Sequence, residues 1–203
     1  MQKSNDPQVI ANLINCLSIL ENNTFELYTN LAEKIDQPMA KSIFIHIAVD
    51  SHKHSMSLKC VAEKIGKPDK KPKNCEKHVG EVWRTIEKIS KEISKKERIT
   101  REDWPELLEK LSALESVVGE EYYMFVELKT LQLMAKEIRQ MYHVDISDLE
   151  SIFTRIIQEE ETHRALIEKV KKLLTKVTEK KSRAPVVKYQ QPDSWNKPMP
   201  TTL

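Results

Sequence analysis

Hydrophobic residues recur every three or four positions along four long stretches of this chain, which is the spacing of one face of an α-helix. The first stretch begins at Asp6-Pro7, where an N-cap acceptor precedes a proline at the first helical position. Asp36-Gln-Pro38 ends it and begins the second stretch, which stops at Gly66. The third follows Thr100–Asp103, and the fourth follows the capping box Ser147–Glu150. The pattern predicts an all-α protein with four long helices.

The remaining segments indicate the domain organisation. Residues 67–74 are typical of a loop, and residues 75–96 repeat an apolar face from Val79 to Ile93, which predicts one further amphipathic helix. It would lie in a crossover, residues 67–104, between two helical hairpins. Residues 130–146 predict an extension of the third helix or a short added one. From residue 182 the chain is rich in proline and polar residues, which favours an extended or disordered tail. We expect one helical domain over residues 1–181 and a tail over residues 182–203.

The two hairpins resemble each other in sequence. Leu17–Tyr28 matches Leu111–Tyr122, and this places two glutamates, Glu21 and Glu115, 94 residues apart at equivalent positions. Ile47–His54 likewise matches Ile156–His163. The chain is therefore interpreted as a duplicated helical hairpin.

Polar residues of metal-ligand type interrupt the apolar faces of this duplicated pattern. Each lies four or seven positions from apolar residues and therefore shares their helix face, pointing inward. A buried carboxylate costs several kcal/mol unless a positive group meets it, and a divalent cation can meet carboxylates from several helices at once. Taken singly, each residue would more often be a boundary or core side chain. Together they predict a metal site formed by Glu21, His54, Glu115, Glu160 and His163.

This arrangement resembles the ferritin-like superfamily of carboxylate-bridged di-iron proteins, in particular its rubrerythrin-like and bacterioferritin-like members. Their pattern is a glutamate on helices one and three and Glu-x-x-His on helices two and four. Glu21 and Glu115 match the single glutamates, Glu160 and His163 match the second Glu-x-x-His, and His54 matches the first histidine. The resemblance covers residues 7–178 without the crossover helix. It implies a ferritin-like four-helix bundle in which Glu160 bridges two ions, one also held by Glu21 and His54, the other by Glu115 and His163.

One position departs from the family pattern. The first Glu-x-x-His reads Ser51-His-Lys-His54, so a serine stands where the family has a bridging glutamate. The smaller side chain would open a coordination position for water, oxygen or a substrate, and it equally fits a site that has decayed to a structural role. Asp50 could turn toward this position, as could His46, although both fit an exposed surface better. The missing carboxylate therefore favours one bound ion over two.

The resemblance also gives a role to two tyrosines. Tyr28 and Tyr122 each lie seven positions after their glutamate, on the same helix face. The family would make them hydrogen-bond donors or electron sources beside iron, and ordinary core tyrosines are the alternative.

The function implied is that of a non-haem iron protein, with one or two ions, that oxidises ferrous iron with oxygen or peroxide or acts as a related oxidoreductase. Manganese is a second candidate metal. Rubrerythrin-like proteins often carry a rubredoxin-like pair of Cys-x-x-Cys motifs, and this sequence has none. The resemblance therefore implies that an external electron donor would be needed. The alternative is a ferritin-like scaffold with a degraded site that serves as a partner-binding or assembly module. We expect a homo-oligomer, with a dimer as the first candidate.

Composition limits the classes of partner and the location that the sequence predicts. The 33 basic and 31 acidic residues leave a net charge of +2, which gives no argument for nucleic acid or an anionic membrane. No apolar run reaches about 18 residues and no signal peptide opens the chain, so a cytoplasmic location is expected. Cys16 and Cys60 are expected at a similar height in antiparallel helices, either as two small core residues or as a redox pair.

Overall fold

The computed structural model describes residues 7–69, 72, 74–125 and 147–182, and its regular elements in these residues are all helices. They are α1 (Pro7–Glu33), α2 (Pro38–Ile65), α3 (Cys75–Val79), α4 (Glu81–Ser94), α5 (Trp104–Phe125) and α7 (Ser147–Ser182). The all-α prediction is confirmed. The segment 130–146, residues 183–203 of the predicted tail and the side chain of Tyr122 lie outside what the structure describes. Within the described residues, no helix is both long enough and apolar enough to cross a bilayer.

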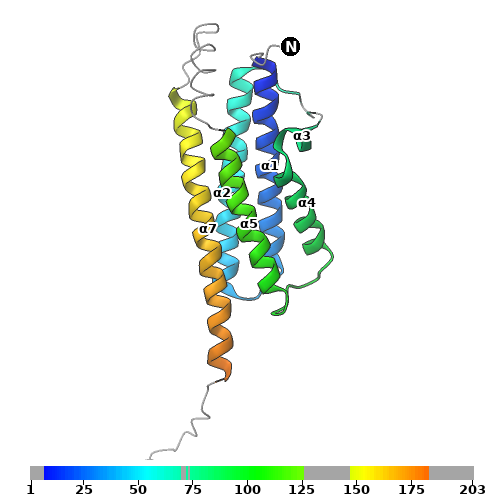
Figure 1. The fold of residues 1–203 in the computed structure, drawn as a ribbon, viewed down its shortest axis with the longest axis vertical. Coiled ribbons are helices and arrows are strands. Elements are labelled where there is room, and N and C mark those ends of the chain that lie inside the picture. Colours follow the sequence, from blue (N-terminus) through cyan, green and yellow to red (C-terminus); the bar gives the residue numbers. More distant parts are fainter. Residues whose placement is uncertain (1–6, 70–71, 73, 126–146, 183–203) are drawn as a thin grey trace, which may run out of the picture.

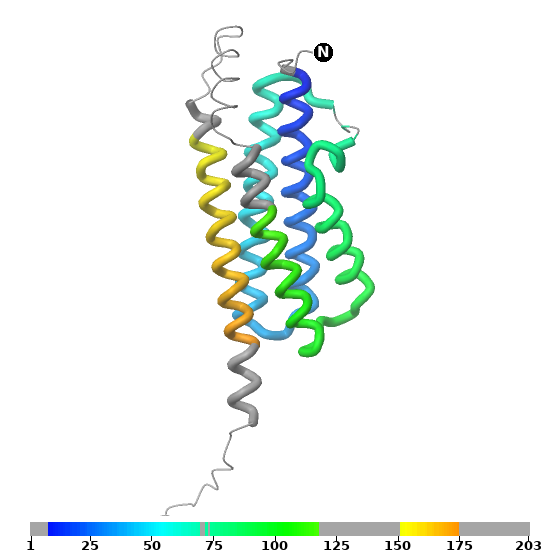
Figure 2. Tube along the Cα trace, in the orientation of Figure 1, coloured from blue at the N-terminus to red at the C-terminus, as the bar shows by residue number. Residues whose placement is uncertain are grey.

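The long helices lie side by side in two antiparallel pairs (Figure 1). Helix α1 packs against α2, α5 packs against α7, and α2 and α7 bring the two pairs together. The crossover helix α4 follows the outer side of α1 toward the end where α5 begins, as the tube in Figure 2 shows. The chain thus brings its second hairpin alongside its first, which sets the two halves of the duplicated pattern face to face.

The predicted boundaries of the second helix are confirmed at both ends. Gln37 is the N-cap of α2, and its side chain accepts a hydrogen bond from the amide of Ala40, while Pro38 occupies the first turn. At the other end the amide of Gly66 donates to the carbonyl of Ala62 at 3.0 Å. Backbone groups that a helix end leaves without partners are therefore satisfied at both ends.

The crossover differs from the prediction of one helix over residues 75–96. It contains two helices, α3 and α4, separated by Gly80, whose φ of 73° lies in a region open to glycine and costly for other residues. The amide of Gly80 still donates to the carbonyl of Glu76 at 2.9 Å, which closes α3. The predicted apolar face is retained across the break, because Val79, Val82 and Ile93 are all buried.

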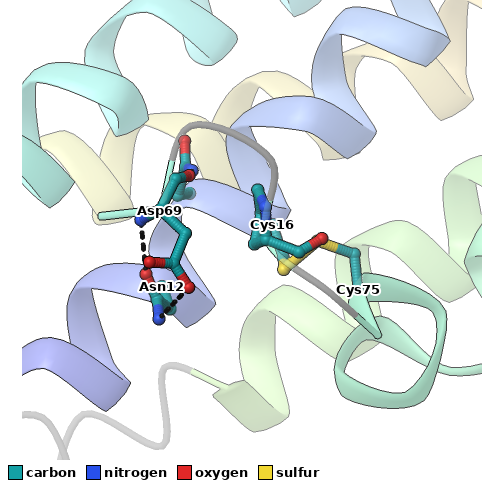
Figure 3. Close-up of a disulfide and its surroundings, with 6 residues drawn as sticks. Asn12, Cys16, Asp69 and Cys75 are labelled. Atoms are coloured by element: carbon teal, nitrogen blue, oxygen red, sulfur yellow. Dashed lines mark hydrogen bonds between the residues drawn. A yellow bond between two sulfur atoms is a disulfide. The ribbon is translucent and has the colours of Figure 1, made fainter.

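The cysteines pair differently from the expectation. Cys16 of α1 forms a disulfide with Cys75 of α3, with Cα atoms 5.2 Å apart (Figure 3), while Cys60 is an exposed free thiol. Cys16 is buried, as expected, but both alternatives for Cys60 are wrong: it is exposed on α2, so it is not a core residue, and it does not pair with Cys16. Beside the disulfide, Asn12 and Asp69 exchange two hydrogen bonds of 2.8 and 3.2 Å. The start of the crossover is therefore fixed to α1 by covalent and polar contacts.

Candidate metal centre

The five side chains predicted as metal ligands lie together in the interior, although they come from four helices. Glu21 belongs to α1, His54 to α2, Glu115 to α5, and Glu160 and His163 to α7. None is more than 3% exposed. Buried carboxylates and imidazoles at this density require strong compensation by charge or metal, so the cluster is a candidate functional site.

The five residues form two groups of three that share one glutamate. Glu21, His54 and Glu160 form the first triad, and Glu115, His163 and Glu160 form the second. Within each triad the candidate ligand atoms all lie within 4.8 Å of one another. This is the division that the family resemblance implied.

Glu160 is central because its two carboxylate oxygens face different histidines. Its Oε1 lies 3.2 Å from Nδ1 of His54, and its Oε2 lies 3.4 Å from Nδ1 of His163. The same nitrogens lie 3.7 Å from Glu21 and 3.6 Å from Glu115, respectively. Neither Nδ1 atom has hydrogen-bond geometry to these oxygens. The Nδ1 side of each ring therefore faces carboxylate oxygens without being committed to a hydrogen bond.

The opposite nitrogen of each histidine is held by a carboxylate from the other hairpin. Nε2 of His54 donates to Oε2 of Glu159 on α7 at 2.7 Å, and Nε2 of His163 donates to Oδ2 of Asp50 on α2 at 3.3 Å. Such outer carboxylates fix the tautomer and direct the second nitrogen inward. Asp50 thus lies against His163 instead of turning toward the Ser51 position. Glu159 was not predicted from the sequence, although it is the counterpart of Asp50 in the duplicated pattern.

Lys53 joins the two outer carboxylates on the solvent side. Its Nζ lies 2.9 Å from Oδ1 of Asp50 and 2.8 Å from Oε2 of Glu159. Burial alone would lower the pKa of Lys53, but the bonds to Glu159 and Asp50 outweigh burial and raise it. Arg155 adds a contact of 2.9 Å to Glu159, and the exposed His46 lies 3.5 Å from Asp50. The negative charges of the two outer carboxylates are therefore balanced by the positive charges of Lys53 and Arg155.

The ionisation of the metal-free cluster is set by competition between burial and charge. Burial opposes protonation of the histidines, but Glu160 and Glu21 raise the pKa of His54 to about 10, and Glu115 and Glu160 raise the pKa of His163 to about 11. For Glu160 the two histidines outweigh burial and lower its pKa, whereas burial dominates for Glu115 and raises its pKa. Both histidines are therefore protonated at neutral pH when no metal is bound.

Tyr28 lies beside the second triad, where its hydroxyl donates a hydrogen bond to Oε1 of Glu115 across the gap between α1 and α5. The ring is fully buried. Burial and the neighbouring Glu115 raise the pKa of Tyr28 well above its usual value, so the phenol stays neutral. Tyr28 therefore holds one oxygen of Glu115 in place.

Ser51 occupies the first-hairpin position that corresponds to Glu160. It is 1% exposed, and its hydroxyl makes no hydrogen bond to any residue that the structure describes. The centre thus receives a carboxylate from this position in the second hairpin and only a short hydroxyl from the first.

A comparison of the chain with protein-family models, curated proteins and solved structures finds no match.

Proposed function

We propose that this chain is a ferritin-like metal protein, a four-helix bundle that holds one or two iron ions and oxidises ferrous iron with oxygen or peroxide. The observation that carries this proposal is the grouping of five buried ligand-type side chains into two triads that share Glu160. A set of three carboxylates and two imidazoles, contributed by facing helices, suits non-haem iron and also manganese.

The arrangement of the histidines supports the fit of a metal. Their Nε2 atoms are occupied by Glu159 and Asp50, so Nδ1 is the atom left for coordination in each ring. Glu21 with His54 would hold one ion, Glu115 with His163 would hold the other, and Glu160 would bridge them. Bound iron would supply the electron-transfer chemistry toward oxygen or peroxide.

The protein's own side chains would position and neutralise this centre. The outer carboxylates orient the imidazoles, and Tyr28 fixes the orientation of Glu115 by its hydrogen bond. The low exposure of all five ligands keeps bulk water away from the reacting atoms. Electrons for repeated turnover would come from an external donor.

Anaerobic titration with ferrous iron, followed by exposure to oxygen, tests the proposal. We expect one to two iron ions per chain by elemental analysis, a metal-dependent rise in melting temperature, and loss of both in Glu160→Gln. At a free-iron concentration about 100 times the dissociation constant, binding should add about 2.7 kcal/mol to the free energy of unfolding. Fewer than about one ion per chain, with the same content in Glu160→Gln, would contradict the proposal.

A metal-free helical scaffold that binds a partner is the second candidate. It is favoured by the protonation of His54 and His163, which can compensate the buried carboxylates without an ion. Ile45, Val49 and Met56 are exposed along α2 and would contribute apolar surface to a homodimer. A melting temperature that does not respond to metal, together with a dimer in solution, would favour this function.

A further inference from the structure

We propose that a small monocarboxylate, of the size of formate or acetate, binds beside Ser51 and completes the metal centre. The inference deepens the proposed function and depends on it, because metal ions would hold the anion. It identifies the chemical class of an external ligand that the first hairpin is built to accept.

The duplicated pattern indicates where this ligand would bind. Ser51 precedes His54 by three positions, as Glu160 precedes His163, so each pair lies on one helix face. From its position, Glu160 places one oxygen near each histidine, at 3.2 and 3.4 Å. Ser51 cannot reach as far, since its side chain ends at Oγ, one position before the carboxylate carbon Cδ of a glutamate. A separate carboxylate beside it would offer the two oxygens that Glu160 offers from the opposite side.

The hydroxyl of Ser51 is suited to hold such an anion. Buried hydroxyls nearly always have a hydrogen-bond partner, yet that of Ser51 has none among the described residues. Ser55, one turn further along α2, shows the ordinary case, because its hydroxyl lies 3.3 Å from that of Ser18. Ser51 could therefore donate a hydrogen bond to one carboxylate oxygen while both oxygens face the metals.

Charge favours an anion over water at this position. Glu21, Glu115 and Glu160 supply three negative charges, one fewer than the four positive charges of two divalent ions. Asp50 and Glu159 do not make up the difference, since Lys53 and Arg155 already pair with them. One additional monoanion would balance the buried centre. The enclosure of Ser51 limits this anion to a small one.

Manganese binding by the full chain tests the inference without any turnover. The protein is titrated with Mn²⁺ under anaerobic conditions at constant ionic strength, with formate, acetate, bicarbonate or chloride as the anion. We expect formate to strengthen binding of the second ion by about tenfold. ¹³C-labelled formate should also show hyperfine coupling to bound manganese. A larger effect of bicarbonate than of formate or acetate would overturn the assignment to a monocarboxylate.

Variants locate the effect at Ser51. Ser51→Glu supplies the missing carboxylate within the chain, so it should bind two ions without formate and show neither a formate response nor ¹³C coupling. Ser51→Ala should retain the fold and weaken the response, and Ser55→Ala is the matched control that should respond as the unchanged protein does. Circular dichroism checks the folding of each variant. If Ser51→Glu does not fold, the formate response of Ser51→Ala relative to Ser55→Ala decides whether the anion binds beside Ser51.

The outcomes separate this inference from the function on which it depends. If manganese binds equally well with formate and chloride and no ¹³C coupling appears, the inference is wrong and the metal centre stands. An equal formate response in Ser51→Ala and Ser55→Ala would likewise show that the anion does not bind beside Ser51. If no metal binds under any condition, the proposed function itself fails.

Discussion

The two hairpins place the same kinds of side chain around the centre but differ at one decisive position. Glu21 and His54 in the first hairpin correspond to Glu115 and His163 in the second, and all four are buried to a similar degree. At the next equivalent position the second hairpin has Glu160, which belongs to both triads, while the first has Ser51. The two hairpins therefore pack alike but contribute differently to the centre, because only the second hairpin supplies a carboxylate, that of Glu160, which both triads share.

The hairpins also depend on each other for orientation. Each histidine is held by a carboxylate of the opposite hairpin, Glu159 for His54 and Asp50 for His163. Lys53 connects these two carboxylates, and its equivalent in the second hairpin is Thr162, which carries no charge. Thus Glu160 of the second hairpin links the two triads and forms an inner bridge. Lys53 of the first hairpin links the two outer carboxylates and forms an outer bridge.

The largest effect is expected from removing the inner bridge. Glu160→Gln should abolish tight metal binding in both triads, because one neutral amide replaces the carboxylate that both histidines face. The metal-dependent gain of about 2.7 kcal/mol at 100-fold excess over the dissociation constant should disappear in thermal unfolding. Glu161→Gln changes the next residue, which is exposed, and should keep full metal content. Two ions in Glu160→Gln would show that the triads do not share a ligand.

Metal binding should also release protons from both hairpins. With pKa values raised from 6.5 to about 10 and about 11, His54 and His163 are protonated at pH 7 and must lose their protons to bind metal at Nδ1. We expect release of about two protons from the histidines for two ions, and a further fraction of a proton from Glu115, whose pKa burial raises to about 7. Calorimetry in buffers of different ionisation enthalpy measures this release. Metal affinity should rise with pH. Release near zero would contradict the protonated state of both rings.

The metal-free protein should show the opposite pH dependence. Because the folded pKa values of both histidines are raised, their pairing with the carboxylates stabilises the fold fully below pH 6.5. This stabilisation is lost as pH rises through about 10 and 11. Chemical denaturation of metal-free protein between pH 6 and 11 measures the loss, and a stability that increases over this range would exclude the pairing.

Sequence alone predicted the parts of this protein that depend on local periodicity. The ends of α2 at Pro38 and Gly66 follow from proline and glycine chemistry, and the inward direction of the five ligand-type residues follows from helical spacing. The break at Gly80 was missed because the apolar face continues across it. The Cys16–Cys75 pair was missed because it depends on how the short α3 packs against α1.

The contact between Glu159 and His54 was missed for a similar reason. Glu159 lies four positions before His163 in sequence, yet it bonds the histidine of the other hairpin, which only tertiary packing reveals. The duplicated pattern held a usable signal, since Glu159 aligns with Asp50. Inward-facing residues of ligand type could thus be predicted from one helix at a time, whereas the partners of their side chains depend on how two helices pack.

A smaller effect is expected from removing one outer carboxylate. Glu159→Gln should weaken the ion held by His54, and Asp50→Asn should weaken the ion held by His163, each by about 10-fold to 100-fold. The effect should therefore cross from the mutated hairpin to the other one. Proton NMR of the cobalt-loaded protein, which resolves shifted imidazole N–H signals, identifies the affected histidine. A change confined to the histidine of the mutated hairpin would disprove the crossed arrangement.

The smallest effect is expected from Lys53→Met, which removes the outer bridge and keeps the length of the side chain. Lys53 is 46% exposed, and partly exposed ion pairs contribute about 0–1 kcal/mol, so each ion should bind only a few-fold more weakly. Because Lys53 contacts both outer carboxylates, the two affinities should fall together, and high salt should reduce the difference from the unchanged protein. Lys59→Met, at an exposed position on the same helix, should leave both affinities unchanged. If Lys53→Met lowered the affinity for only one ion, the lysine would support a single triad. The similarity between the two halves of the centre would then extend to the histidines but not to the lysine beyond them.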